Sequence, residues 1–439
     1  MREMKDSGVS WIGVIPKDWA VHRIKTIFSE RTELSETGRE ILMSVSEYYG
    51  VDSRSSHIEE DEYLSRSESL VGYKKCFPGD IVSNIMLAWK GSLGVARQAG
   101  IVSPAYCVYK PSNEIIPLYY HYLFRTALYT WQFKCYSKGI IDSRLRLYSP
   151  FFYDIPALIP PISEQQCIAD VLDTKFKEID TILEKTKASI EEYKKLKQSI
   201  ITESVTKGIY GDNRPMKDSG FEWIGEIPAE WKIMKLRSIG RAQNGISKGS
   251  DCFGTGTPFV SYSDVYKNAI LPRTINGLVQ STEQEQEIFS VCSGDIFFTR
   301  TSETIEEIGF SSVCLDSIPK AVYAGFLIRL RPKDDTVLPC YSKYYFRSDI
   351  PRYFFVKEMN LVTRASLSQD LLKSLPVLIP SREEQQEIAT YLDEKCATID
   401  ILIASKEELI SELESYKQSL VYEYVTGKKE VLVQEGGLS

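Results

Sequence analysis

The sequence predicts a mixed α+β fold: two α/β domains joined by two long antiparallel helices that form a coiled-coil spacer, with a pseudo-twofold internal repeat. Residues 156–207 recur at 376–427 with 22 of 52 positions identical. Residues 4–19 recur at 216–231 with 11 of 16 positions identical. Short apolar runs between these repeats, separated by Gly, Pro, Asn and Asp, are typical of strands. The chain therefore contains the same pair of repeated segments twice, with a different segment between them each time.

Each copy of the longer repeat predicts a long helix. Proline ends the extended run before it, because the residue preceding proline avoids helical geometry. Ser163 with Gln166, and Ser381 with Glu384, have the spacing of a capping box. Apolar residues then recur every three, four or seven positions, and such a narrow stripe needs a partner helix. The other copy is the nearest candidate, and an antiparallel pair would bring the end of each helix beside a copy of the 16-residue element.

The inserted segments, 20–155 and 232–375, are expected to be mixed α/β. Two aromatic-rich stretches, Leu118–Tyr136 and Cys340–Lys357, predict helices. Strands are expected within Asp80–Leu87, Val95–Ser103, Cys107–Pro111, Thr257–Val265, Gly294–Thr301 and Gly325–Pro332. The predicted domains are 1–159, a helix at 160–208, 209–379, a second helix at 380–428, and a tail at 429–439.

Composition limits the class of protein. A chain of 439 residues should hold more than one domain, and 43% apolar residues indicate a globular protein. Nine cysteines without a CxxC pair favour reduced thiols, and we expect a cytoplasmic protein because no run reaches membrane-spanning length. The net charge is −7, with the excess acid on the second helix and the tail. The two inserted segments are balanced in charge and could each present a basic face.

Catalytic motifs are not found in the sequence, so the chain is not expected to be an enzyme. Phe253–Pro258 has the glycines of a nucleotide-binding loop but no helical pattern after it, which favours a plain Gly-rich turn. The histidines His22, His57 and His121 lack metal-ligand spacing, so no metal site is predicted. Asp393–Lys395 resembles the end of a nuclease motif but lies in the second helix, where a solvated face is expected.

Polar and aromatic residues beside Gly-rich turns are the candidate DNA contacts. Arg, Lys and Asn side chains suit base edges, and the others suit phosphates or packing. Arg144 and Arg364 occupy the same repeat position although their surroundings differ, which suggests a shared role. For each residue the alternative is an ordinary surface or core position. The predicted DNA-binding set is Asn84, Trp89, Lys90, Tyr106, Lys138, Arg144 and Arg146 in the first segment, and Tyr262, Ser263, Arg300, Thr301, Tyr323, Arg364 and Ser366 in the second.

The duplicated motifs resemble the specificity subunit of type I restriction–modification systems. Pro160–Ile168 and Pro380–Ile388 carry the resemblance at the start of each helix, with Ser381 where the family has a second proline. The sequence Trp-Ile-Gly-x-Ile-Pro at 11–16 and 223–228 carries it before each inserted segment, and so does the stretch from Gly79 to Tyr106. The resemblance covers nearly the whole chain.

That resemblance implies a non-catalytic subunit that binds double-stranded DNA. The two inserted segments would be target-recognition domains, each reading one half of a bipartite sequence. The helices would set the spacing and hold two methylation subunits. Those partners would bind S-adenosylmethionine and methylate adenine at N6, and restriction subunits using ATP and Mg would join the same core.

Two other classes of function stay open from the sequence. One is a coiled-coil scaffold or an acidic DNA mimic without direct DNA contact, which the balanced charge of the inserted segments disfavours. The other is an enzyme with its own nuclease or methylase activity, which the absent motifs disfavour.

Overall fold

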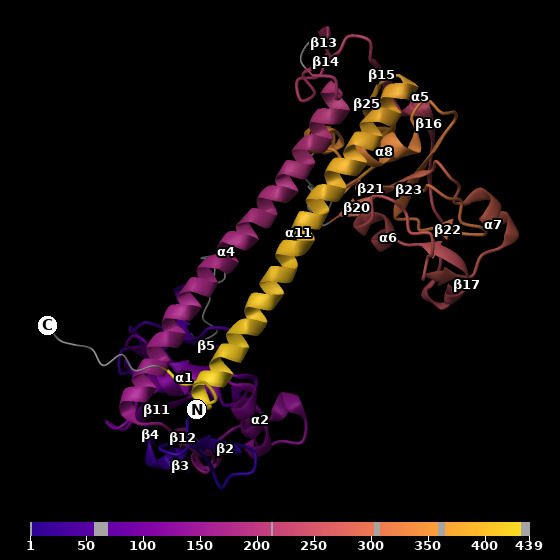
Figure 1. Ribbon diagram of the computed structural model, residues 1–439. Helices are drawn as coiled ribbons and strands as arrows, with labels where there is room; N and C mark the ends of the chain where they lie inside the picture. Colours follow the sequence, from indigo (N-terminus) through magenta and orange to yellow (C-terminus); the bar gives the residue numbers. More distant parts are fainter. Residues whose placement is uncertain (1, 57–68, 212–213, 303–307, 359–364, 432–439) are drawn as a thin grey trace. The chain divides into compact units, whose positions relative to one another are not determined.

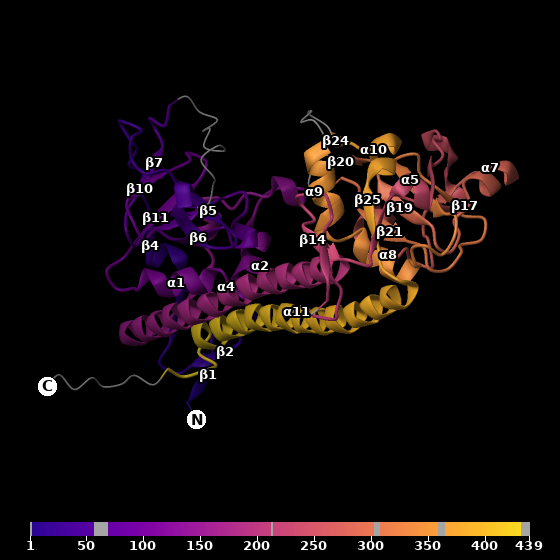
Figure 2. The same ribbon diagram turned by 90° about the horizontal axis from the view of Figure 1, so that it is seen from above.

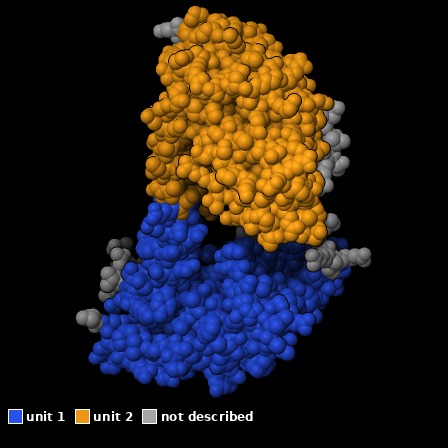
Figure 3. Space-filling view, turned by 90° about the vertical axis from the view of Figure 1, so that its right-hand side faces the viewer, with its two compact units in different colours: residues 1–186, 408–439 blue, residues 187–407 orange. Residues whose placement is uncertain are grey.

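The computed structural model describes residues 2–56, 69–211, 214–302, 308–358 and 365–431, and it divides into two compact units. Unit 1 holds residues 1–186 and 408–439, and unit 2 holds residues 187–407 (Figure 3). Each unit thus takes one inserted segment, called a head below, and one half of each long helix. The domain boundaries predicted from the sequence separated each long helix from the heads. The structure groups them differently because Ile168 and Leu172 belong to the core of the first head.

Two long helices are present where the repeat predicted them. Helix α4 spans Ile162–Lys207 and helix α11 spans Arg382–Val425 (Figure 1). The predicted capping boxes are wrong. Ser163 already lies inside α4, and although Ser381 Oγ accepts a hydrogen bond from the backbone N of Glu384 (3.2 Å), the Glu384 carboxylate bonds elsewhere.

The two helices run antiparallel within each unit, as Figure 2 shows. In unit 1, Lys417 Nζ of α11 pairs with Asp180 Oδ1 of α4 at 2.6 Å and lies 4.3 Å from the centroid of the Phe176 ring. In unit 2, Lys197 Nζ of α4 pairs with Asp400 Oδ2 of α11, also at 2.6 Å. The pairing expected from the apolar stripe is therefore formed in both units. Among the described residues, no helix is long and apolar enough to cross a membrane.

A buried carboxylate joins each helix start to the 16-residue element before it. In unit 1, Glu164 accepts hydrogen bonds from Trp19 Nε1 (2.8 Å) and Arg2 Nη2 (2.7 Å). In unit 2, Glu384 accepts them from Trp231 Nε1 (2.8 Å) and an arginine, Arg214 Nη1 (2.5 Å). Both tryptophans are fully buried, so these contacts lie inside the protein rather than on its surface.

The end of each helix packs against the same elements. Gly427 follows α11 with φ +70°, and a Cβ there would lie 2.5 Å from Pro16 Cγ. Gly208 follows α4 with φ +79°, and a Cβ there would lie 3.5 Å from Trp231 Cζ2. Glycine suits such left-handed helix ends because it lacks the Cβ that disfavours them. The neighbourhood predicted from repeat order is confirmed in both units.

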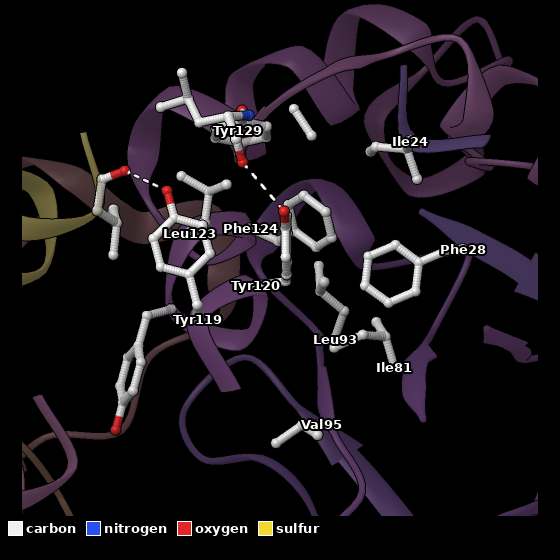
Figure 4. Packing of buried hydrophobic residues seen from close by; sticks show 14 of the residues in the cluster. Ile24, Phe28, Ile81, Leu93, Val95, Tyr119, Tyr120, Leu123, Phe124 and Tyr129 are labelled. Atoms are coloured by element: carbon white, nitrogen blue, oxygen red, sulfur yellow. Dashed lines mark hydrogen bonds between the residues drawn. The ribbon is translucent and has the colours of Figure 1, made fainter. Parts of the chain in front are cut away.

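The head of unit 1 is built on a four-stranded antiparallel sheet in the order β4-β11-β8-β9. Helices α1 (Pro117–Phe124), α2 (Ala127–Tyr136) and α3 (Ser149–Tyr153) supply aromatic side chains to its core, which includes Tyr120, Phe124 and Tyr129 (Figure 4). The other elements are β1 (Met4–Asp6), β2 (Val14–Pro16), β3 (Ala20–Arg23), η1 (Ile24–Thr26), β4 (Phe28–Glu30), β5 (Met43–Ser46), β6 (Gly50–Ser53), η2 (Arg54–Ser56), β7 (Lys74–Cys76), β8 (Ile81–Ser83), η4 (Ala88–Lys90), β9 (Leu93–Val95), β10 (Gly100–Val102), β11 (Cys107–Pro111), η5 (Asp142–Arg144) and β12 (Pro156–Ile159).

The head of unit 2 has an equivalent sheet, β16-β23-β19-β21, and a further sheet, β18-β17-β22. Strand β15 pairs with β25, as β3 pairs with β12 in unit 1. The elements are β13 (Met216–Asp218), β14 (Glu226–Pro228), β15 (Lys232–Lys235), α5 (Leu236–Ile239), β16 (Gly240–Asn244), η6 (Ser250–Cys252), β17 (Phe253–Val260), α6 (Tyr262–Lys267), β18 (Leu278–Val279), α7 (Glu283–Ile288), β19 (Ile296–Thr299), β20 (Thr301–Ser302), β21 (Ser311–Val313), β22 (Val322–Tyr323), β23 (Leu327–Pro332), α8 (Pro339–Tyr345), α9 (Asp349–Glu358), β24 (Ala365–Ser366), α10 (Gln369–Ser374) and β25 (Pro376–Ile379).

Three sequence-based expectations for the heads need correction. Each aromatic-rich stretch forms two helices, α1 with α2 and α8 with α9, because the chain turns at Arg125 and Arg347. Part of the expected strand Thr257–Val265 is helix α6, which Ser261 begins with a capping box to Asp264. Phe253–Pro258 is strand β17 with a bulge rather than a Gly-rich turn. The expectation of mixed α/β heads is otherwise confirmed.

Candidate nucleic-acid interface

The strongest candidate interface in unit 1 is the loop that follows α2. Residues Lys138 and Arg146 bond to each other through their backbones in both directions (2.9 Å each), so the loop returns beside its own start. The backbone N of Leu147 then donates to Ile85 O (2.9 Å), which fixes the loop against the segment after β8. Lys138 and Arg144 are exposed, and Arg146 is half-buried. Arg146 Nη1 donates to Leu145 O (2.8 Å), whereas the exposed Lys138 and Arg144 can meet an anion.

A tryptophan connects this loop to η4. Trp89 donates from Nε1 to Met86 O (3.1 Å), which holds its ring. Lys134 Nζ lies 4.9 Å and Lys90 Nζ 5.4 Å from the ring centroid, within range of a cation–π interaction. Lys134 also pairs with Asp142 of η5 at 2.8 Å. Lys90 and Lys134 thus lie at the Trp89 ring, and the loop after α2 carries Lys138, Arg144 and Arg146. These five cations together with Trp89 are called the basic surface below.

Exposed apolar side chains lie within the basic surface, and the sequence reasoning missed them. Ile140 is 100% exposed at the loop tip, beside Gly139 with its φ of +150°. Ile141 and Trp131 are exposed as well. The sequence feature that could have indicated these exposed side chains is a Gly-Ile-Ile stretch directly after a basic residue. Aliphatic wedges and aromatic faces among cations are a pattern that nucleic acids bind, because bases stack and phosphates pair with the charges.

Two predicted contacts of unit 1 lie apart from that surface. Asn84 is buried, and its Oδ1 accepts a hydrogen bond from the backbone N of Met86 (3.1 Å), so it shapes the segment that carries Trp89. Its side chain lies inside the protein, and its role as a DNA contact stays a prediction. Tyr106 is half-buried beside a separate apolar cluster, and burial raises the pKa of its hydroxyl.

The predicted residues of unit 2 divide into two places. Tyr262 and Ser263 begin helix α6, where the Tyr262 ring stacks on Tyr266 with centroids 5.7 Å apart. Thr301 of β20 pairs with Ser366 of β24, and Ser366 is exposed. Arg300 lies at the same edge, since the backbone N of Leu367 donates to Arg300 O (2.7 Å). This pairing repeats that of Leu147 with Ile85 in unit 1.

Two further predictions for unit 2 have different outcomes. Tyr323 is 0% exposed, and its hydroxyl donates to Gln243 O (3.2 Å). Its ring is part of the core, and its role as a DNA contact stays a prediction. Arg364 lies outside the described residues, so the proposed equivalence with Arg144 stays a prediction.

No ligand set for a metal ion is formed among the residues that the structure describes. His121 is buried, and desolvation lowers its pKa to about 3, so it is neutral at pH 7 and its Nδ1 accepts from Val95 N (3.2 Å). His57 lies outside the described residues. Asp393 is not only a solvated residue of α11 as predicted, because it accepts hydrogen bonds from Lys343 (2.5 Å) and Tyr344 (2.6 Å).

Comparison with known proteins points to one family. The family model described as "Type I restriction modification DNA specificity domain" matches residues 16–192 and again 228–414. Among relatives, the chain is 23% identical over 433 residues to the type I restriction enzyme EcoKI specificity subunit of Escherichia coli (strain K12), covering 95% of this chain and 90% of that one. It is 24% identical over 428 residues to the MjaVIII specificity subunit of Methanocaldococcus jannaschii, covering 94% and 93%.

The fold agrees with those matches. A chain solved in work on complex assembly and conformational transition of the type I R-M system superposes with a TM-score of 0.72, covering 94% of this chain and 99% of that one, at 17% sequence identity. Each family match covers one head and most of the long helix that follows it. The repeat found in the sequence is therefore a repeat of one known domain, and the chain belongs to the family of the type I restriction modification DNA specificity domain.

Proposed function

We propose that this chain is the DNA-recognition subunit of a type I restriction–modification complex, in which each head reads one half of a bipartite target. The basic surface of unit 1 carries the proposal, because it places cations for phosphates beside side chains suited to bases. Phosphate contacts position a protein on DNA, and base contacts give the sequence preference. Family membership supports the same role for the head of unit 2, where Tyr262, Ser263, Arg300, Thr301 and Ser366 remain the candidate contacts.

We further propose that the helices set the distance between the half-sites and hold two methylation subunits. Exposed apolar residues recur at equivalent positions of the two helices. Ile182 of α4 corresponds to Leu402 of α11, and Leu196 of α4 corresponds to Tyr416 of α11; all four are exposed. Equivalent apolar positions suit two copies of one partner, since a surface that appears twice can bind the same subunit twice.

The chemistry of the complex would lie in the partners. The methylation subunits would bind S-adenosylmethionine and methylate adenine, and restriction subunits would use ATP and Mg. The chain itself would bind and orient the DNA and would not take part in a covalent step. A scaffold or DNA mimic without DNA contact is disfavoured, because the basic surface attracts a polyanion rather than imitating one.

Exchange of one head is the experiment that tests this proposal. Residues 20–155 would be replaced by the corresponding head of another family member, and the methylated motif would be mapped by sequencing in a host that carries the complete system. We expect one half of the motif to change and the other half to stay the same. Both halves changing together would contradict separate reading by the two heads, and the absence of any bipartite motif with the unmodified chain would contradict DNA recognition.

Arg144 should act on the DNA backbone. Replacing it by alanine should weaken binding to all sequences alike and reduce the slope of log affinity against log salt by about 0.9, the value for one phosphate contact. Arg23→Ala is a matched control, because Arg23 is an exposed arginine of the same unit that pairs with Asp154. The measurement is a titration of the assembled complex with target and random DNA at several salt concentrations. Relaxed preference at one base pair, with the salt slope unchanged, would instead make Arg144 a base contact.

A further inference from the structure

Arg125 in the first head and Arg347 in the second are partly buried arginines whose hydrogen bonds, among the described residues, all go to backbone carbonyls. Arg125 stands between α1 and α2, and Arg347 stands between α8 and α9, so they occupy equivalent corners of the two repeats. No described carboxylate pairs with either guanidinium. Desolvation lowers the pKa of each to about 10, which leaves both charged at pH 7. A desolvated cation is costly unless hydrogen bonds compensate for the lost water.

In unit 1 those hydrogen bonds hold the turn between β5 and β6. Arg125 Nη2 donates to Glu47 O and Tyr48 O, both at 2.8 Å, and Nη1 donates to Ser46 O at 3.2 Å. Tyr48 is 84% exposed, so its ring projects into solvent from a turn whose backbone is held from inside. An exposed ring on an anchored backbone is suited to contact with a ligand.

The same guanidinium also holds the segment beside the basic surface. Arg125 Nη1 donates to Gly91 O and Leu93 O, both at 3.0 Å. These residues directly follow η4, which carries Trp89 and Lys90. One side chain therefore fixes two separate segments of the head relative to each other.

In unit 2 the equivalent arginine holds a different kind of element. Arg347 Nη2 donates to the carbonyls of Val265 (2.8 Å), Tyr266 (3.1 Å) and Asn268 (3.0 Å) at the end of α6. Its Nε donates to Ser311 O of β21 (2.6 Å). Helix ends leave carbonyls without partners, and a cation satisfies them. Helix α6 carries Tyr262 and Ser263, which belong to the predicted DNA-binding set.

Hydrogen bonds to backbone carbonyls do not depend on the side chains of the residues that accept them. The held segments differ in sequence and in secondary structure between the heads, yet the donor and its corner are the same. A planar guanidinium presents several donors in fixed directions, which an ammonium group does not. The same arginine can therefore hold the backbone at this corner of each head while the exposed side chains differ from head to head.

We propose that Arg125 and Arg347 are positioning residues for target specificity: each fixes the reading segments of its own head and so determines which bases that head accepts. The proposal rests on the proposed function, because it assumes that the heads read DNA. Lysine keeps the charge but cannot satisfy the same carbonyls together. Arg125→Lys should therefore weaken the sequence preference at one half-site only, and Arg347→Lys should weaken it at the other.

The test uses the full chain in its complete restriction–modification system, with the methylated motif mapped by sequencing for each variant. We expect the preference at one or more positions of a single half-site to fall roughly tenfold, which corresponds to about 1.4 kcal/mol and lies in the range for one mismatched base pair. The other half-site should be unchanged. Arg97→Lys is the matched control, because Arg97 lies in the first head but is exposed and pairs with Asp173 of α4 at 2.6 Å.

A second measurement separates positioning from stability. Hydrogen exchange of the full-length Arg125→Lys chain should be faster at residues 46–48 and 91–93 and unchanged in the paired helices. Lower methylation with an unchanged motif, equal loss at both half-sites, or a variant that does not fold would each make these arginines structural and overturn the proposal. A complex with the unmodified chain that methylates no bipartite motif would overturn the proposed function itself.

Discussion

Replacing Glu384 by alanine should lower the free energy of unfolding of unit 2 by about 3–5 kcal/mol, the cost of removing one partner from a buried ion pair. Glu384 is buried and accepts hydrogen bonds from Trp231 Nε1 and Arg214 Nη1. Without the carboxylate, the fully buried indole N–H of Trp231 loses its acceptor, and the mostly buried Arg214 guanidinium keeps only its pair with the exposed Glu230. The substitution also disconnects the start of α11 from the 16-residue element, so it removes a contact that joins segments far apart in the chain.

Denaturant unfolding of the full-length chain measures this effect. Glu164→Ala should produce the same loss in unit 1, because Glu164 makes the equivalent contacts with Trp19 and Arg2. Glu178→Ala is the control: Glu178 lies on the exposed face of α4 and pairs with Lys175 at 2.8 Å, and exposed pairs contribute about 0–1 kcal/mol. Equal losses for Glu178→Ala and Glu384→Ala would show that the buried carboxylates are not what joins helix and element.

Lengthening both helices by four residues should lengthen the gap between the half-sites by about one or two base pairs. Four residues add about 6 Å at 1.5 Å per residue, and one base pair rises about 3.4 Å. The insertions would be placed between Lys185 and Ser189 of α4 and between Ser405 and Leu409 of α11, so the antiparallel partners stay matched. Four residues rotate a helix by about 400°, nearly a full turn, which keeps the apolar stripe almost in register.

Insertions of two residues at the same places are the matched comparison. They rotate the helix by about 200° and turn the stripe toward solvent, so residues such as Ile179 and Ile190 lose their buried positions. We expect the assembled complex to be lost, and methylation with it. The readout is again the methylated motif. An intact four-residue variant with an unchanged gap would mean that the helices do not determine the spacing, and that the junction at 208–215 does.

The two long helices and the repeated frame were predictable from the sequence because they depend on short-range patterns. Apolar periodicity without interruption by Gly or Pro determines a helix over Ile162–Lys207 almost to its ends. Likewise, Cys107–Pro111 was expected as a strand and forms β11. The repeat order also predicted that the end of each helix would lie beside a copy of the 16-residue element, as Gly208 and Gly427 do.

The candidate site was only partly predictable, because exposure is a tertiary property. Trp89, Lys90, Lys138, Arg144 and Arg146 were predicted as residue types near turns, and the structure places Lys90 beside Trp89 and the other three on the loop after α2. Tyr323 and Asn84 have equally suitable side chains, but the folded chain buries both. Ile140 is apolar and yet lies fully exposed, because the path of the loop after α2 decides on which side its side chain emerges.

The sequence by itself determined the duplicated frame, the two long helices and the class of the heads, because these follow from periodicity, propensity and repeat spacing along the chain. Only the tertiary structure decided the contacts made by single polar side chains. Glu384 was expected to cap its own helix and instead bonds Trp231, while Arg125 and Arg347, which no motif marked, bond the carbonyls of distant segments. A buried donor or acceptor takes whichever partner the packed chain brings near it, and that partner is specified by no local pattern.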